Sequence, residues 1–192
     1  MKSAQAAPPF MDRGRVEDEL RGRGCDILFG AVPPRTCQGT LERNRELCAS
    51  NVCGSYGTNW GCPPGSGTAE ECIGNLRSYG NAAIVIKRFP ETDPGDPDLM
   101  ASLGKDFQDA CRAAKHMMEE CGHRCLVLSD GGCMYCDVCR YPDPCPHPGE
   151  ITPSVSGYGI DVESYLRELG VGFRFEEDAV TLYGIVLYDG VR

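Results

Sequence analysis

The chain is organised around residues 131–146, which read GGCMYCDVCRYPDPCP. Cys133, Cys136 and Cys139 fall at every third position, and Cys145 follows after five more residues, just before a proline. Two-residue gaps allow a tightly turning backbone to direct successive thiolates at one compact inorganic core. The stretch therefore predicts a metal site that is held by these four cysteines.

The spacing favours an iron–sulfur cluster as the bound metal. It is close to the C-x2-C-x2-C-x3-C-P run that holds clusters in bacterial ferredoxins, with the last gap lengthened by two residues. Zinc usually takes its ligands as two separated C-x2-C pairs. Three thiolates within seven residues suit a [4Fe–4S] cube better than one tetrahedral ion. Zinc, and structural or disulfide-bonded cysteines, are the alternatives.

A second group of cysteines precedes this stretch, in a segment that also holds five glycines between positions 54 and 67 and the single tryptophan. Glycine permits the turns that a chain needs when it wraps around a cofactor. No phosphate-binding glycine pattern is present. We therefore expect a second cluster here. Its candidate ligands are Cys48, Cys53 and Cys62, with Cys72 or Cys37 as the fourth.

The pairing of cysteines with sites stays open at this level. In two-cluster ferredoxins, the cysteine before proline ligates the other cluster. Here Cys62 precedes Pro63 and Cys145 precedes Pro146, so the two could be exchanged. If the second site has only three thiolates, one iron is open and can act as a Lewis acid. If a fourth thiolate closes it, both clusters are electron relays.

The composition narrows the class of protein. Thirteen cysteines among 192 residues are too many for an ordinary chain, and the odd number argues against a disulfide scaffold. There is no apolar run of about 18 residues that could cross a membrane, and no signal peptide is recognised. We therefore expect a cytoplasmic protein that does not insert into membranes. A net charge of −9 argues against nucleic-acid binding.

Apolar periodicity predicts a single α/β domain over residues 1–192, with a layered sheet, flanking helices and two cysteine-rich metal-binding loops at 48–72 and 131–150. The final two strands are expected to form an antiparallel hairpin at the sheet edge. The predicted helices cover 13–23, 72–79, 98–121 and 162–169. The predicted strands cover 25–32, 82–89, 124–129, 173–175 and 180–188.

Two motifs carry a resemblance to a known family. They read Cys48…Cys53-x2-Tyr56-x3-Trp60-x-Cys62-Pro63-Pro64 and Gly132-Cys133-x2-Cys136-x2-Cys139-x5-Cys145-x-His147-Pro148. With the later Tyr158-Gly159-Ile160-Asp161-Val162, they resemble the predicted metal-binding proteins catalogued as domain of unknown function 2284. The resemblance spans about residues 25–188. It implies metal binding and no particular reaction.

Three residues other than cysteine are expected near the cofactor. Trp60 would contribute to an apolar shell that limits access of water to a cluster. His147 carries an imidazole, which suits iron and zinc. Tyr56 belongs to the same motif as Trp60.

The sequence therefore predicts a redox protein that binds [4Fe–4S] clusters, one or two per chain, and acts as an electron relay or a small reductase. Such a protein would transfer electrons as an oxidoreductase under anaerobic conditions, and the expected partner is a redox protein. No hydrolase motif is found, and catalytic residues are not assigned. The alternative function is a zinc-binding structural or interaction module without redox chemistry.

Overall fold

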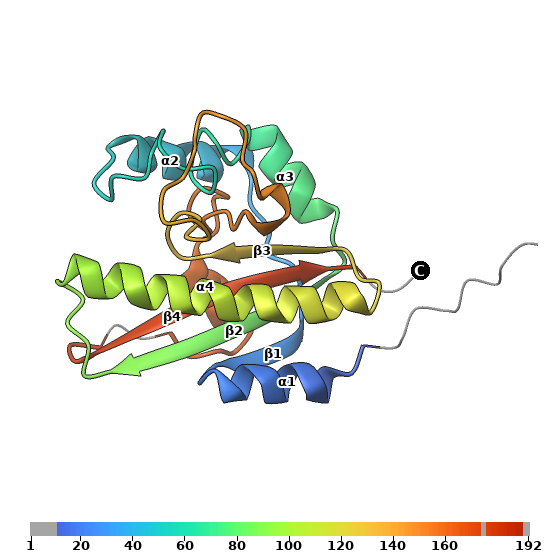
Figure 1. The fold of residues 1–192 in the computed structure, drawn as a ribbon. Helices are drawn as coiled ribbons and strands as arrows, with labels where there is room; N and C mark the ends of the chain where they lie inside the picture. The colour runs from blue at the N-terminus through green and yellow to red at the C-terminus, as the bar shows by residue number, and fades with distance from the viewer. Residues whose placement is uncertain (1–10, 174–175, 190–192) are drawn as a thin grey trace, which may run out of the picture.

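The computed structural model describes residues 11–173 and 176–189, which fold as helices around a four-stranded sheet (Figure 1). The mixed α/β class is therefore confirmed. The strands are β1 (Asp26–Ala31), β2 (Asn81–Pro90), β3 (Cys125–Ser129) and β4 (Ala179–Tyr188). The helices are α1 (Arg13–Gly22), α2 (Gln38–Ala49), α3 (Ala69–Arg77), α4 (Pro97–Glu120) and α5 (Val162–Glu168), with a 3-10 turn at Pro148–Glu150.

The strand order is β1-β2-β4-β3, and every neighbouring pair is antiparallel. Antiparallel pairing therefore extends through the whole sheet and is not confined to the final strands. Helix α4 carries the chain from β2 to β3, which run in the same direction, but β4 is inserted between them. Alternation of strands and helices along the chain therefore coexists with an antiparallel sheet.

The prediction that the final two strands form a hairpin at the sheet edge is wrong. Strand β4 is central and pairs with β2 from Asn81↔Tyr188 to Pro90↔Ala179. Residues 182–188 of β4 are all buried, as expected for a strand that is covered on both faces. Phe173 is not in a strand, and residues 174–175 lie outside the described residues.

The sheet separates two apolar clusters. Neighbouring residues of β2 alternate between them, because successive side chains of a strand point to opposite faces. Ala83 and Val85 pack on the side of α1 and α4, whereas Ala82 and Ile84 pack on the side of α2, α3 and α5. This layering is visible in Figure 1, where α4 crosses in front of the strands.

Helix α2 was not predicted. It is mostly polar and has one buried residue, Leu41, so it lacks the apolar stripe that reveals a helix. The helix begins after Cys37, which is exposed at the N-cap. Helix α3 begins at Ala69, three residues before the predicted start, because Thr68 and Glu71 form a capping box.

The fold brings the two cysteine-rich segments together. Strand β3 ends at Ser129 and leads directly into the second loop, beside α4 (Figure 1). The first loop follows α2, and residues 50–67 contain no helix or strand. Within the part of the chain that the structure describes, no helix is both long and apolar enough to cross a membrane.

Candidate metal centre

The loop after β3 encloses a small pocket. Cys133, Cys136, Cys139 and Cys145 all line it, and each is half-buried. The enclosed cavity between them is small, about 20 Å³. The structure therefore gathers the four thiols of this loop around one space. The other residues that line the pocket are Trp60, Tyr135, Arg140, Pro146, His147 and Ile151.

These thiols are close enough to affect one another's ionisation. Desolvation raises the pKa of the Cys136 thiol, and the neighbouring thiols of Cys145, Cys133 and Cys139 raise it further. Thiolates that share a site repel each other, so the protonated form is favoured in the absence of a cation. Metal coordination reverses this preference, because it deprotonates the thiol. The donor set therefore fits a metal group.

Two residues of the first loop hold the second loop in place. Asn59 Nδ2 donates to the carbonyl oxygen of Cys133 at 2.9 Å, and the Cys133 N–H donates back to Asn59 Oδ1 at 3.0 Å. The indole N–H of Trp60 donates to the carbonyl oxygen of Asp143 at 2.9 Å. The backbone N–H of Trp60 donates to Cys139 Sγ at 3.4 Å. A hydrogen bond of this kind stabilises a thiolate.

Gly61 allows the close approach of the two loops. A Cβ at this position would lie 2.4 Å from the Cys133 nitrogen and 2.6 Å from the Thr152 carbonyl oxygen. Both neighbours are backbone atoms and cannot move aside cheaply. The Gly61 carbonyl also accepts a hydrogen bond from the Ser154 N–H at 2.8 Å. The glycine is therefore required by packing at the junction.

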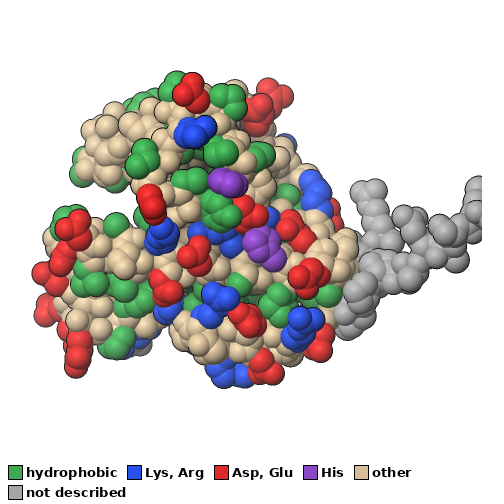
Figure 2. Space-filling model, viewed as in Figure 1, with side chains coloured by type: hydrophobic (Ala, Val, Ile, Leu, Met, Phe, Trp, Pro, Cys, Tyr) green, Lys and Arg blue, Asp and Glu red, His purple; other side chains and the backbone are tan. Residues whose placement is uncertain are grey.

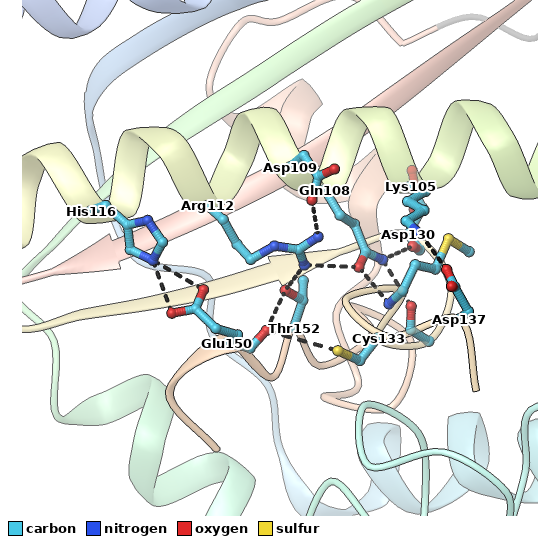
Figure 3. A network of polar contacts seen from close by, with 12 residues as sticks. Lys105, Gln108, Asp109, Arg112, His116, Asp130, Cys133, Asp137, Glu150 and Thr152 are labelled. Carbon is cyan, nitrogen blue, oxygen red and sulfur yellow. Dashed lines mark hydrogen bonds and ion pairs between the residues drawn. The ribbon is translucent and has the colours of Figure 1, made fainter. Parts of the chain in front are cut away.

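Helix α4 supplies a polar face to the same loop (Figure 3). Gln108 is completely buried and acts from the middle of this helix. Its Nε2 donates to the carbonyl oxygens of Gly132 at 2.8 Å and Asp130 at 3.2 Å, and its Oε1 accepts from the Met134 N–H at 3.0 Å. One side chain thus holds the backbone on both sides of Cys133.

Arg112, one turn further along α4, is a buried cation next to the pocket. Its side chain is 4% exposed, and Nη2 pairs with Asp109 at 2.5 Å. Nη1 donates to Thr152 Oγ1 at 3.0 Å, and the guanidinium lies 5.2 Å from the ring centre of Tyr135. Because Tyr135 lines the pocket, a positive charge lies immediately behind the pocket wall.

The far end of the loop is also attached to α4. Lys115 Nζ donates to the Gly149 carbonyl oxygen at 2.6 Å, and His116 Nε2 lies 3.0 Å from both carboxylate oxygens of Glu150. The carbonyl oxygen of Glu150 accepts from the Cys133 thiol at 3.8 Å (Figure 3). His116 is exposed, and its pair with Glu150 connects the end of this loop to α4.

A second group of thiols consists of Cys48, at the end of α2, and Cys53 and Cys62 in the first loop. Burial raises the pKa of Cys62 to about 11, and the nearby Cys53 and Cys48 thiols add to this rise. Burial likewise raises the pKa of Cys48, with a further contribution from Cys53. Cys62 Sγ lies 3.0 Å from the position that a Cβ at Gly132 would occupy. Cys62 therefore lies directly against the second loop, next to Cys133.

Cys72 and Cys37, the two candidates for a fourth ligand, have other surroundings. Cys72 is completely buried in the cluster formed with α3, and Arg45 Nη2 donates to its Sγ at 3.2 Å. The Cys72 thiol donates to the carbonyl oxygen of Ser66 at 3.4 Å. Cys37 Sγ lies 3.3 Å from Thr40 Oγ1 at the start of α2.

Trp60 and His147, which were expected near a cofactor, both line the pocket. The His147 ring packs edge-on against Tyr135, with 5.0 Å between ring centres. Tyr56 is not a lining residue, and its N–H donates to Asn51 Oδ1 at 2.9 Å within the first loop. Its predicted role at the cofactor remains a prediction.

Across residues 11–173 and 176–189, no three His, Cys, Asp or Glu side chains form a group that could hold a metal ion as they stand. The fold and the two sets of thiols define a cysteine-rich α/β protein with a candidate metal centre. The chain belongs to the family described as predicted metal-binding protein (DUF2284), whose sequence model matches residues 40–188. The resemblance drawn from the motifs is thus confirmed. No curated protein and no solved structure matches the chain.

Sequence reasoning missed the residues of α4 that hold the site. Gln108, Arg112 and Lys115 recur at spacings of four and three, so they share one face of the helix. That spacing was available as a signal. Polar residues beside an apolar stripe usually form the solvent face, however, and periodicity does not show whether a loop covers them.

Proposed function

We propose that this protein binds a [4Fe–4S] cluster through Cys133, Cys136, Cys139 and Cys145 and transfers electrons, as a relay or a small reductase. The observation that carries the proposal is that these four cysteines, at near-ferredoxin spacing, line one pocket. When bound, such a cluster supplies one-electron redox chemistry. The residues of the chain hold it, shield it and adjust its potential.

The same residues could bind zinc, and the spacing of the thiols along the chain favours the cluster over that alternative. In a zinc site four thiolates converge on one ion at about 2.3 Å. In a cluster each thiolate binds a different iron, so the sulfurs surround an inorganic core. The near-ferredoxin spacing of the four thiols is typical of the second arrangement. A zinc-stabilised module without redox chemistry is the second candidate.

The surroundings of the pocket are suited to tuning a cluster. Hydrogen bonds to sulfur and limited access of solvent set the reduction potential. The Trp60 backbone N–H supplies one such bond, to Cys139 Sγ. This hydrogen bond is expected to raise the potential, because it stabilises the more negative, reduced state. Arg112 is paired with Asp109, so its charge is largely compensated.

We also propose a second cluster at Cys48, Cys53 and Cys62. Its support is the proximity of the three thiols to one another and of Cys62 to Gly132. Cys145 lines the pocket with Cys133, Cys136 and Cys139, whereas Cys62 lies with Cys48 and Cys53. Because Cys62 also lies beside Gly132, local ligation and the exchange of Cys62 with Cys145 are both compatible with this arrangement. Adjacent clusters would allow electrons to pass between them.

A redox protein is the partner that we propose, in the cytoplasm, where thiols stay reduced. Two apolar residues of the loop after β3 are exposed, with Val138 at 80% and Tyr135 at 40%. The face in Figure 2 is hollowed between the segment formed by α2 with its following loop and the amino-terminal end of α4. Acidic and basic side chains are interspersed on this face, which does not favour nucleic acid.

Anaerobic purification followed by iron, zinc and acid-labile sulfide assays tests the function. The proposal predicts a brown protein with sulfide and iron in equal amounts and a substantial loss of both in Cys139→Ser. Cys121→Ser is the matched control and should retain both, because Cys121 lies at the end of α4, away from the pocket. Tightly bound zinc without sulfide would refute the redox function and favour the zinc module.

A further inference from the structure

We infer that an open cavity between α3 and the segment before α2 binds a small organic acid, which carries one carboxylate on an apolar body. The cavity has a volume of about 460 Å³. Residues 32–36, between β1 and α2, form one wall, and the second half of α3 through Gly80 forms the other. None of its lining residues lines the pocket of the four cysteines, so the inference does not rest on the proposed function.

The size and the lining of this cavity suit a small molecule. Ligand-binding pockets usually measure about 300 to 1,000 Å³ and present mostly apolar side chains with a few polar groups. Here Leu76 is buried, and Ile73 and Tyr79 are half-buried and pack against the same apolar cluster. Val32, on the other wall, is 61% exposed. The apolar body of a ligand would cover this surface, and its burial would stabilise the complex.

Two arginines give the cavity its charge. Arg35 comes from the segment before α2, and Arg77 comes from the last turn of α3. Within residues 11–173 and 176–189, neither guanidinium makes a hydrogen bond or an ion pair, and no Asp or Glu lines the cavity. Both charges are therefore uncompensated. A guanidinium presents a fork of N–H donors that matches the two oxygens of a carboxylate.

The walls favour a carboxylate over a phosphate. Phosphate sites commonly use backbone N–H groups at the amino-terminal end of a helix or in a glycine-rich loop. Here α3 contributes its carboxyl-terminal end, and Pro33 and Pro34 have no N–H. The end of the helix carries a negative charge of about half an elementary charge, which the two guanidinium charges exceed. A singly charged head is thus attracted, whereas a phosphate would lack backbone donors.

Both walls are held in place by contacts to the rest of the fold. The Tyr165 hydroxyl donates to the carbonyl oxygen of Val32 at 2.8 Å, and the Thr36 hydroxyl donates to the carbonyl oxygen of Gly159 at 2.8 Å. The burial of Leu76 fixes α3 to the apolar cluster. A site that is ordered before binding loses less conformational entropy when its ligand enters.

Isothermal titration calorimetry of the full chain with 4-phenylbutyrate tests the inference. One molecule should bind per chain. 4-Phenylbutanamide has the same apolar body without the charge, and it should bind about tenfold more weakly because a charge-assisted hydrogen bond is lost. Sulfate, an anion without an apolar body, should bind more weakly than 4-phenylbutyrate. These comparisons use the wild-type protein and need no variant.

Substitutions then locate the site. Arg35→Gln and Arg77→Gln should each weaken the binding of 4-phenylbutyrate about tenfold. Arg43→Gln is the matched control, because Arg43 is exposed on α2 and does not line the cavity, so the affinity should not change. Circular dichroism checks that each variant is folded. Iron and sulfide contents should be the same in all three variants, since none of these residues lines the pocket of the four cysteines.

Four results would overturn the inference. The first is the absence of saturable binding of 4-phenylbutyrate to the wild type. The second is equal affinity for the acid and its amide, and the third is sulfate binding as tight as that of the acid. The fourth is an affinity for 4-phenylbutyrate that falls equally in Arg77→Gln and Arg43→Gln, because the acid would then bind outside the cavity. None of these results bears on the metal content, which tests the proposed function separately.

Discussion

The substitution Gln108→Leu tests whether α4 holds the loop after β3, which carries the four cysteines of the pocket. Leucine fills this fully buried position with a side chain of similar size but removes every hydrogen bond that Gln108 makes. Three of those bonds, at 2.8, 3.0 and 3.2 Å, fix the backbone at Gly132, Met134 and Asp130. Each contributes about 1 kcal/mol, so we expect a loss of about 3 kcal/mol in the free energy of unfolding.

Urea denaturation of the metal-free, reduced protein measures this loss by linear extrapolation. Gln38→Leu is the matched control, because Gln38 is exposed on α2 and its side chain donates to Glu42, one turn along the same helix. Its effect should stay within about 0.5 kcal/mol. Iron content after reconstitution provides a second measurement, which should fall in Gln108→Leu alone. A loss below about 1 kcal/mol with unchanged iron would show that α4 does not position the loop.

Further substitutions test the junction, a buried carboxyl and a helix cap. Gly61→Ala should lower the free energy of unfolding by about 2 kcal/mol, because its Cβ would meet the Cys133 backbone, whereas Gly74→Ala on α3, which has open space, should be neutral or stabilising. Equal effects of Gly61→Ala and Gly74→Ala would contradict the close approach of the two loops at Gly61. Burial raises the pKa of Asp130, so its contribution to stability is present below the unfolded pKa and lost as pH rises through the folded one. Asp130→Asn should therefore raise the melting temperature at pH 7 more than at pH 4, and an unchanged difference across a pH series would refute this. Thr68→Ala should cost about 1 kcal/mol, seen in urea denaturation, and no loss would show that the capping box is dispensable.

Regular elements with strong patterns were predictable from the sequence. The apolar stripe of α4 and the short apolar runs of β2 and β3 gave these elements to within a few residues. These patterns are local consequences of burying one helix face or one strand. Helix α2 was missed because its burial involves Leu41 alone.

Strand order was decided by tertiary packing. Strand β4 could be recognised as a strand, but its insertion between β2 and β3 could not, because its position depends on which partners bury both of its faces. A continuous apolar run is compatible with several places in a sheet. The predicted edge hairpin failed for this reason.

The cysteine spacing by itself determined the first pocket, since Cys133, Cys136, Cys139 and Cys145 lie in one short loop and local turns suffice to gather them. Tertiary structure alone decided what surrounds them. The Asn59 contact with Cys133 spans 74 residues of sequence, and the Gln108 contact with Gly132 spans 24. Such pairs are chosen by the packing of whole elements, and a sequence pattern carries local geometry but not the choice of distant partners.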